Sequence, residues 1–231
     1  MWEGYARFFG DSVFVPTFTA IIGAFIRLLG DGEFWAAYAS TLRPFAFGWA
    51  AALIIGISLG LMMGRSRILT GLTAPHIAFL NALPVSTLVP VVVIVAGIDL
   101  TARAMVVFLF AIVEVILTTA SGVRYVDPDL VDMARSFGMK RWRRFTRVIL
   151  PGAAAGIAAA VRVGTGRAVV GMVVMELLLV SVGVGKLISR YRDFFQAPEL
   201  YAVVLSLAIF ALAVQAVLRR LENRALIWRG E

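Results

Sequence analysis

Residues 127–151 read DPDLVDMARSFGMKRWRRFTRVILP, a charged segment between long runs of uncharged sequence. Three aspartates precede six basic residues in it, Gly138 lies near its middle, and it closes on Leu150-Pro151. Because the sequence on either side is apolar, we interpret this segment as a water-facing element held between membrane spans. An element of this length is accessible to soluble proteins, and we predict that it is a docking surface.

The composition of the chain places it in the membrane class. Of its 231 residues, 61% are hydrophobic and 16% are charged, whereas soluble domains average about 45–50% apolar and about 25% charged residues. The net charge of +8 is explained by basic cytoplasmic loops, so we expect no nucleic-acid partner. The absence of cysteine and the single histidine exclude disulfides, thiolate metal sites and histidine-rich metal sites, and we expect no cofactor bound by this chain.

Five segments are apolar enough to cross a bilayer as helices, which takes roughly 20 residues each. The second of them contains Pro75, Pro84 and Pro90, and we predict a short leading segment followed by one irregular span. The five predicted spans are residues 44–64, 68–98, 104–123, 156–180 and 200–218. We therefore expect an all-α integral membrane protein with about five transmembrane helices.

The N-terminal region is predicted to hold an interfacial helix over residues 16–29. The uncharged run over residues 13–26 is short for a span, and Arg27 follows it. Pro16 is expected in the first helical turn, where its missing N–H costs nothing. A tilted sixth span is the alternative interpretation, and no cleavable signal peptide is expected.

The positive-inside rule orients the spans. The turn at 65–67, the loop at 124–147 and the tail after residue 218 fall on one side and carry more than half of the 22 basic residues. That side is predicted to be cytoplasmic, which leaves the N-terminus outside if there are five spans. The bases expected on the outer side are Arg7, Arg27, Arg43, Arg103, Lys186, Arg190 and Arg192.

The charged segment matches the spacing of a known loop, E-A-A-x3-G-x9-I-x-L-P. The matching residues are Asp132, Met133, Ala134, Gly138, Val148, Leu150 and Pro151. The segment thus resembles the EAA loop of the transmembrane permease subunits of bacterial ABC importers. Residues 41–64, 83–94 and 162–185 resemble the nitrate/sulfonate/taurine branch of these permeases, and the similarity covers about residues 13–229.

This resemblance implies a type I ABC importer permease fold. It divides the chain into an N-terminal segment, 1–40, and a transmembrane permease domain, 41–229, with a cytoplasmic coupling loop at 124–151. The implied partners are a second permease copy in a homodimer, two cytoplasmic ATP-binding subunits that hold ATP and Mg, and a periplasmic or extracellular substrate-binding protein. The chain itself would be a non-enzymatic, multi-pass subunit in the bacterial inner membrane.

The resemblance also implies the solute class and the residues that contact the ATPase. A small anionic solute such as a sulfonate, taurine or nitrate is expected, with a thiamine-precursor pyrimidine, riboflavin or an aromatic carboxylate as the alternative. Residues 130–137 can form an amphipathic helix with Leu130, Ala134 and Phe137 near one face, and Gly138 can end it in a left-handed conformation. The residues assigned to ATPase coupling are Leu130, Asp132, Met133, Ala134, Phe137, Gly138, Leu150 and Pro151.

Two features depart from the pattern of the family. Asp132 stands in place of the glutamate and Met133 in place of an alanine, so the contacts with the ATPase are expected to differ. Relatives commonly carry an additional N-terminal span. Either the five-span core suffices here or the stated start is internal to a longer product.

Polar residues inside the apolar segments are candidates for a translocation pathway. Glu114 lies near the centre of its span, where a carboxylate is costly, so it either lines the pathway or pairs with Arg162 or Arg167 across the bundle. A purely structural ion pair or a protonated carboxyl is the alternative. Glu176 lies roughly 13 Å along a helix from Arg167, too far for direct pairing. The residues assigned to the pathway are Asn81, Ser86, Thr87, Glu114, Arg167 and Glu176, with a packing kink as the alternative explanation for the proline-rich stretch.

Two other classes of function compete with the importer interpretation. An ion-coupled secondary transporter working through Glu114 and Glu176 predicts inverted repeats, which the sequence does not show. A membrane enzyme would have to rely on the same two glutamates. The sequence shows no G-x4-G-K-[ST] loop, so we expect ATP hydrolysis in a separate subunit.

Overall fold

The computed structural model describes residues 3, 6, 14–179 and 182–226, and all regular elements in these ranges are helices. Four of the described helices are long and apolar enough to cross a membrane, or five if a sharply bent helix pair counts as one span. The prediction of an all-α membrane protein with about five spans is confirmed.

Four of the five predicted spans lie on the four long helices. They are α3 (Gly32–Arg65), α6 (Leu100–Arg124), α10 (Ala154–Leu179) and α12 (Ala197–Leu226). Residue 180, where the span on α10 was predicted to end, lies outside the described residues, as does residue 229, the predicted end of the domain.

Helix α3 begins twelve residues before the span that we predicted at Pro44. Asp31 caps it by accepting a hydrogen bond from Glu33 N at 2.9 Å, and Pro44 is buried inside the helix. The charge of Arg43 limits the apolar segment but does not stop helix formation, so hydropathy placed the start too late. The same helix runs through residues 40 and 41, where we predicted a domain boundary.

The predicted interfacial helix is α2 (Phe18–Leu29), a short apolar helix. It begins two residues after Pro16, because Thr17 acts as the N-cap and accepts a hydrogen bond from Ala20 N at 3.3 Å. Pro16 therefore precedes the cap. Our prediction that it lies in the first helical turn was wrong. Helix α2 packs against α12, and Arg27 pairs with Glu199 there at 2.9 Å.

The proline-rich stretch forms two helices, α4 (Arg67–Ala82) and α5 (Val85–Ala96), which meet at an angle of 93°. The bend falls at Leu83-Pro84, where a proline cannot continue the hydrogen-bonding pattern of the preceding helix. Pro75 and Pro90 lie inside their helices and do not break them. The irregular span that we predicted is therefore a broken span or a re-entrant pair.

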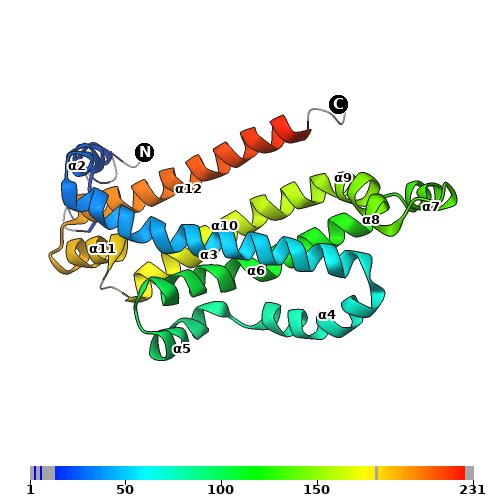
Figure 1. Cartoon of the computed structure of the whole chain (residues 1–231). Coiled ribbons are helices and arrows are strands. Elements are labelled where there is room, and N and C mark those ends of the chain that lie inside the picture. Colours follow the sequence, from blue (N-terminus) through cyan, green and yellow to red (C-terminus); the bar gives the residue numbers. More distant parts are fainter. Residues whose placement is uncertain (1–2, 4–5, 7–13, 180–181, 227–231) are drawn as a thin grey trace.

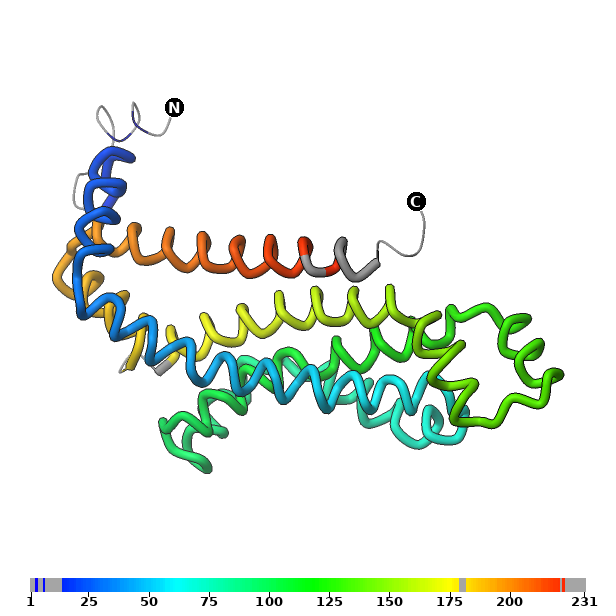
Figure 2. The backbone as a smooth tube through the Cα atoms, turned by 45° about the horizontal axis from the view of Figure 1, so that its top comes forward, coloured from blue at the N-terminus to red at the C-terminus, as the bar shows by residue number. Residues whose placement is uncertain are grey.

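The described helices form an elongated bundle with two distinct ends. Figures 1 and 2 show α2 and α11 (Gly183–Asp193) at one end, and α7 (Pro128–Ser136) with the α3–α4 turn at the other. This arrangement agrees with our prediction that the turn at 65–67 and the loop at 124–147 share one side of the membrane.

Close contact between α3, α6 and α10 forms the centre of the bundle. A Cβ atom added at Gly60 would lie 2.6 Å from Thr119 Cβ, and a Cβ atom added at Gly122 would lie 2.6 Å from Gly156 Cα. Small residues at such positions let helix backbones approach closely, which is the main source of helix association in a bilayer. The polar groups of α6 and α10 are consequently held in defined positions against one another.

Candidate functional site: the charged loop and a polar pocket at the broken span

The charged segment folds as a short helix, α7, followed by a return path to the membrane. Asp127 caps α7 by accepting a hydrogen bond from Asp129 N at 2.9 Å, and Pro128 occupies the first turn. Proline is favoured there because its N–H would have no intrahelical partner. Asp129 in the first turn also interacts favourably with the positive end of the helix dipole.

Gly138 ends α7 in a left-handed conformation with φ of +69°. Gly138 N donates to Arg135 O at 2.9 Å and Met139 N donates to Ala134 O at 3.1 Å. These two bonds form a Schellman motif, which satisfies the last carbonyls of the helix. The local structure therefore agrees with the role that we predicted for Gly138 in ending the helix.

The three residues that we predicted near one face of this helix, Leu130, Ala134 and Phe137, differ in their exposure to solvent. Leu130, Met133 and Phe137 are exposed, with Phe137 at 83%, whereas Ala134 is only 4% exposed. Val131 also turns inward and packs against a small core that includes Val126 and Ile149. Ala134 thus supports the loop from inside, and Met133, one of the two departures from the family pattern, belongs to the exposed apolar face.

The chain returns to the membrane through α8 (Arg141–Arg144), a π-helical turn (Phe145–Ile149) and α9 (Leu150–Gly152). Leu150 N donates to Phe145 O in this wider turn, and Pro151 follows, where no backbone N–H can donate. Leu150 and Pro151 are half-buried at this junction with α10. They belong to α9 and not to α7, whereas Asp132, which is exposed, lies on α7 itself.

A second polar feature is a pocket of about 240 Å³ at the break between α4 and α5. Asn81 and Ser86 line it from the two sides of the break, and Glu114 from α6 and Arg167 from α10 line it from the bundle. Arg167 Nη2 donates to Glu114 Oε1 at 2.6 Å. Of the two partners that we considered for Glu114, the structure selects Arg167, because Arg162 pairs with Glu222 at 2.8 Å.

Thr87 is not among the residues that line this pocket. Its hydroxyl donates to Pro84 O at 2.8 Å, which ties the first turn of α5 to the break. Four of the six residues that we assigned to the pathway are thus brought together, and Thr87 lies beside them in a local structural role.

Glu176 lies away from this pocket, buried inside the bundle. Its carboxylate accepts hydrogen bonds from Arg103 and from Gly185 N, the latter at 2.9 Å. Arg103 also donates to Ser40 at 3.3 Å. We had placed Arg103 in an outer loop, but α6 begins at Leu100, so Arg103 falls in its first turn and is buried. The sequence gives no signal that a basic residue close to the end of a span points into the bundle and not toward water.

Potential metal ligands do not gather in the part of the chain that the structure describes, where no three His, Asp or Glu residues form a group suited to an ion. The chemistry available in the two sites is therefore that of charge pairing, hydrogen bonding and apolar contact. An exposed apolar face on a helix outside the predicted spans is suited to docking, and a half-exposed ion pair at a broken span is suited to contact with a polar solute.

The chain is similar to known membrane transport components over most of its length. The protein family described as "Binding-protein-dependent transport system inner membrane component" matches residues 52–226. The putative aliphatic sulfonates transport permease protein SsuC of Escherichia coli (strain K12) is 30% identical over 222 residues, which cover 93% of this chain and 81% of SsuC. The riboflavin transport system permease protein RibX of Chloroflexus aurantiacus is 28% identical and covers 99% of this chain and 86% of RibX.

The fold has a counterpart among solved structures. A chain of the MetNI methionine ABC transporter, in a structure described as showing inward-facing conformations, matches with a TM-score of 0.68 at 15% sequence identity. The match covers 82% of this chain and 96% of that chain.

Proposed function

Because this chain belongs to the family of binding-protein-dependent transport system inner membrane components, we propose that it is the permease subunit of an ATP-driven importer in the bacterial inner membrane. Two copies would enclose the translocation pathway as a homodimer. Two ATP-binding subunits would dock on the cytoplasmic loop and hydrolyse ATP with Mg, and an external binding protein would deliver the solute. The observation that carries this proposal is the exposed apolar face on α7.

The construction of the loop supports a role in transmitting motion. Leu130, Met133 and Phe137 present apolar area to a partner, and the burial of such area drives association. Behind this face, Val123 of α6 and Ile149 before α10 share one small core. A force on α7 is therefore passed to the ends of two spans. Energy enters transport when the ATP-binding subunits contact the loop differently in their two states.

The solute that we propose is a small anion of the sulfonate, taurine or nitrate kind. The name of SsuC supports it, as does the guanidinium of Arg167, 55% exposed at the pocket. A guanidinium offers paired donors to an oxyanion. Riboflavin is the alternative, because RibX is almost as similar. Uptake of labelled taurine and of labelled riboflavin by the assembled complex with its binding protein distinguishes the two.

Site-specific crosslinking tests the docking proposal directly. The chain contains no cysteine, so Phe137→Cys introduces a single thiol on the exposed face of α7. We expect a bifunctional reagent to join this thiol to an ATP-binding subunit in membranes that contain the intact complex.

Phe194→Cys is the matched control, because Phe194 is 71% exposed in the turn between α11 and α12, at the opposite end of the bundle. This variant should give no product with the ATP-binding subunit. Equal products from both positions, or none from Phe137→Cys in complexes that still assemble, would overturn the docking model.

A further inference from the structure

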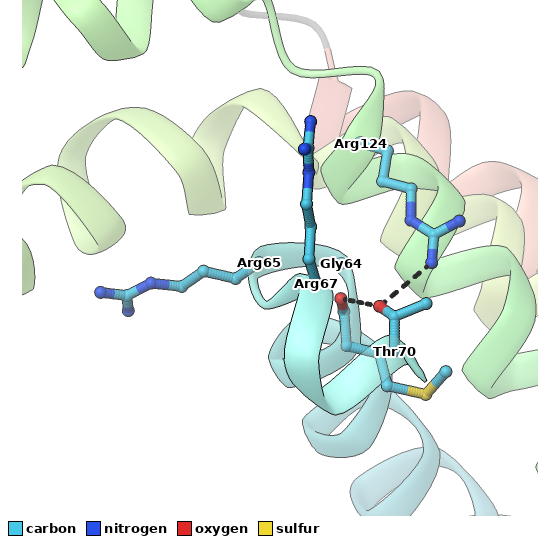
Figure 3. Close-up of a pocket in the computed structure, with 6 residues that line it drawn as sticks. Gly64, Arg65, Arg67, Thr70 and Arg124 are labelled. Atoms are coloured by element: carbon cyan, nitrogen blue, oxygen red, sulfur yellow. Dashed lines mark hydrogen bonds between the residues drawn. The ribbon is translucent and has the colours of Figure 1, made fainter. Parts of the chain in front are cut away.

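A pocket of about 460 Å³ lies at the cytoplasmic end of the bundle, beside the loop but distinct from the exposed face of α7. Its walls come from the end of α3, the start of α4 and the end of α6. Figure 3 shows Arg65 and Arg67 extending from the α3–α4 turn in different directions, with Arg124 bending toward Thr70 from α6. The residues that line it are Met63, Gly64, Arg65, Arg67, Thr70 and Arg124.

The positive charge of this pocket is not balanced within the described part of the chain, where Arg65, Arg67 and Arg124 take part in no ion pair. Arg124 Nη2 donates to Thr70 Oγ1 at 3.3 Å, and Thr70 in turn donates to Met63 O at 2.7 Å. This chain of bonds orients Arg124 but leaves most of its five N–H donors available. Three such cations around one hollow favour an anion with several oxygen acceptors, such as a phosphate.

The three arginines lie at the ends of helices that are apolar enough to cross a membrane or to form part of a broken span. Arg65 ends the uncharged stretch of α3, Arg67 opens α4, and Arg124 is the last residue of α6. Basic residues that directly follow apolar spans reach the membrane interface. The cytoplasmic leaflet carries anionic phospholipids that attract such residues.

The helices that carry the arginines also offer an apolar surface toward the centre of the membrane. Met62, Ile68 and Leu72, each within two turns of the pocket, are all exposed, with Ile68 at 77%. A ligand that satisfies both regions has an anionic head and an apolar tail. An acidic protein surface or free phosphate would use the arginines alone.

We propose that this pocket holds the phosphate of an anionic phospholipid from the cytoplasmic leaflet, with its acyl chains along the exposed apolar residues of α3 and α4. Arg65 also lines a neighbouring pocket formed with Arg135, Arg141 and Arg144 of the cytoplasmic loop. Arg65 further lies with its Cζ 5.3 Å from the centre of the Phe145 ring. The bound lipid thus connects the bundle with the loop, and the coupling between them depends on the lipid composition.

Lipid retention by the purified complex tests this proposal. The wild-type complex in nanodiscs of phosphatidylglycerol should retain this lipid on transfer to detergent, as counted by native mass spectrometry. Nanodiscs of phosphatidylcholine should leave no retained lipid. The double variant Arg67→Gln/Arg124→Gln should bind phosphatidylglycerol about 25-fold more weakly, since each base near an anionic surface contributes about a factor of five.

The double variant Arg219→Gln/Arg220→Gln is the matched control, because it removes the same charge from the C-terminal part of α12, outside the pocket. It should retain phosphatidylglycerol as the wild type does. Equal loss in both variants would reduce the effect to general surface charge and overturn the proposal. So would competition by millimolar inorganic phosphate, which would assign the pocket to a free anion.

Two further measurements can contradict the lipid proposal. The Arg67→Gln/Arg124→Gln complex could lose its ATP-binding subunits while its lipid retention stays unchanged. This result would mean that the arginines contact the ATP-binding subunits, and it would overturn the lipid proposal. Should the variant fail to fold, the wild type alone decides, because the proposal requires a higher apparent Tm in phosphatidylglycerol than in phosphatidylcholine nanodiscs of equal thickness. Equal Tm values in the two lipids would contradict it.

Discussion

Two ion pairs join α6 to α10, and their surroundings differ. In one, Arg103 of α6 pairs with Glu176 of α10, and the two side chains are 7% and 4% exposed. In the other, Glu114 of α6 pairs with Arg167 of α10, and the side chains are 26% and 55% exposed. The same two helices therefore carry one pair that is closed in protein and one that opens on a pocket.

The closed pair belongs to a network that joins four helices. Besides Arg103, Glu176 accepts a hydrogen bond from the backbone of Gly185 in α11, and Thr41 of α3 accepts one from Val184 N at 3.0 Å. A buried charge that loses its partner is costly, whereas an exposed one is solvated. The comparison teaches that an ion pair in this chain matters most for stability where protein encloses it, and matters less where solvent reaches it.

The largest effect is expected from Glu176→Gln. The substitution keeps the shape of the side chain but leaves the Arg103 guanidinium buried without a counter-charge, which typically costs about 3–5 kcal/mol. Denaturant unfolding of the purified protein in one detergent measures the loss. Arg27→Gln, which breaks the exposed pair with Glu199, is the control and should cost about 1 kcal/mol or less. If the two variants lost similar amounts of unfolding free energy, burial would not explain a difference between the two ion pairs.

A smaller effect is expected from Gly183→Ala. The glycine has φ of +63°, and a Cβ there would meet Thr41 Oγ1 and lie 2.5 Å from Glu176 Oε2. Backbone strain and crowding of the closed pair together should destabilise the protein by about 2–3 kcal/mol.

Gly138→Ala separates the two causes, since Gly138 has φ of +69° with nothing within 4 Å of an added Cβ. That variant should show only the backbone part, about 1–2 kcal/mol. The same denaturant series measures both variants, and equal losses would show that contact with Glu176 contributes nothing.

The smallest effect on stability is expected from Glu114→Gln, which should change the free energy of unfolding by about 1 kcal/mol or less because Arg167 is accessible to solvent at the pocket. Solute uptake by proteoliposomes that contain the whole complex should nevertheless change. Glu222→Gln, which breaks the ion pair with Arg162 outside the pocket, should leave uptake as it is. Normal uptake by the Glu114→Gln complex would leave this pair with a structural role alone.

Much of the architecture could be predicted from local sequence. The spans followed from runs of apolar residues, because membrane insertion depends on composition over roughly 20 residues. The start and end of α7 followed from Asp127, Pro128 and Gly138, because caps and left-handed glycines act over a few residues. The irregular course of the proline-rich stretch followed in the same way. Each of these features is determined by neighbours along the chain.

The wrong predictions concern which side of a helix is buried and where a helix begins. Ala134 was placed on the exposed face of α7, but a helix of nine residues has apolar residues on more than one side, and packing chose which of them to bury. The start of α3 was placed at Pro44, because hydropathy reports where a segment can lie in lipid and not where the helix begins.

The sequence by itself determined that this is a multi-pass helical membrane protein with a charged loop of a recognisable kind. Composition, span length and the spacing around Gly138 are properties of the chain read in order. Only the tertiary structure decided the partners of the charges. Arg103 meets Glu176 across 73 positions of sequence and Glu114 meets Arg167 across 53. These pairings, and whether each one is enclosed or open, depend on how α6 and α10 lie against each other in space.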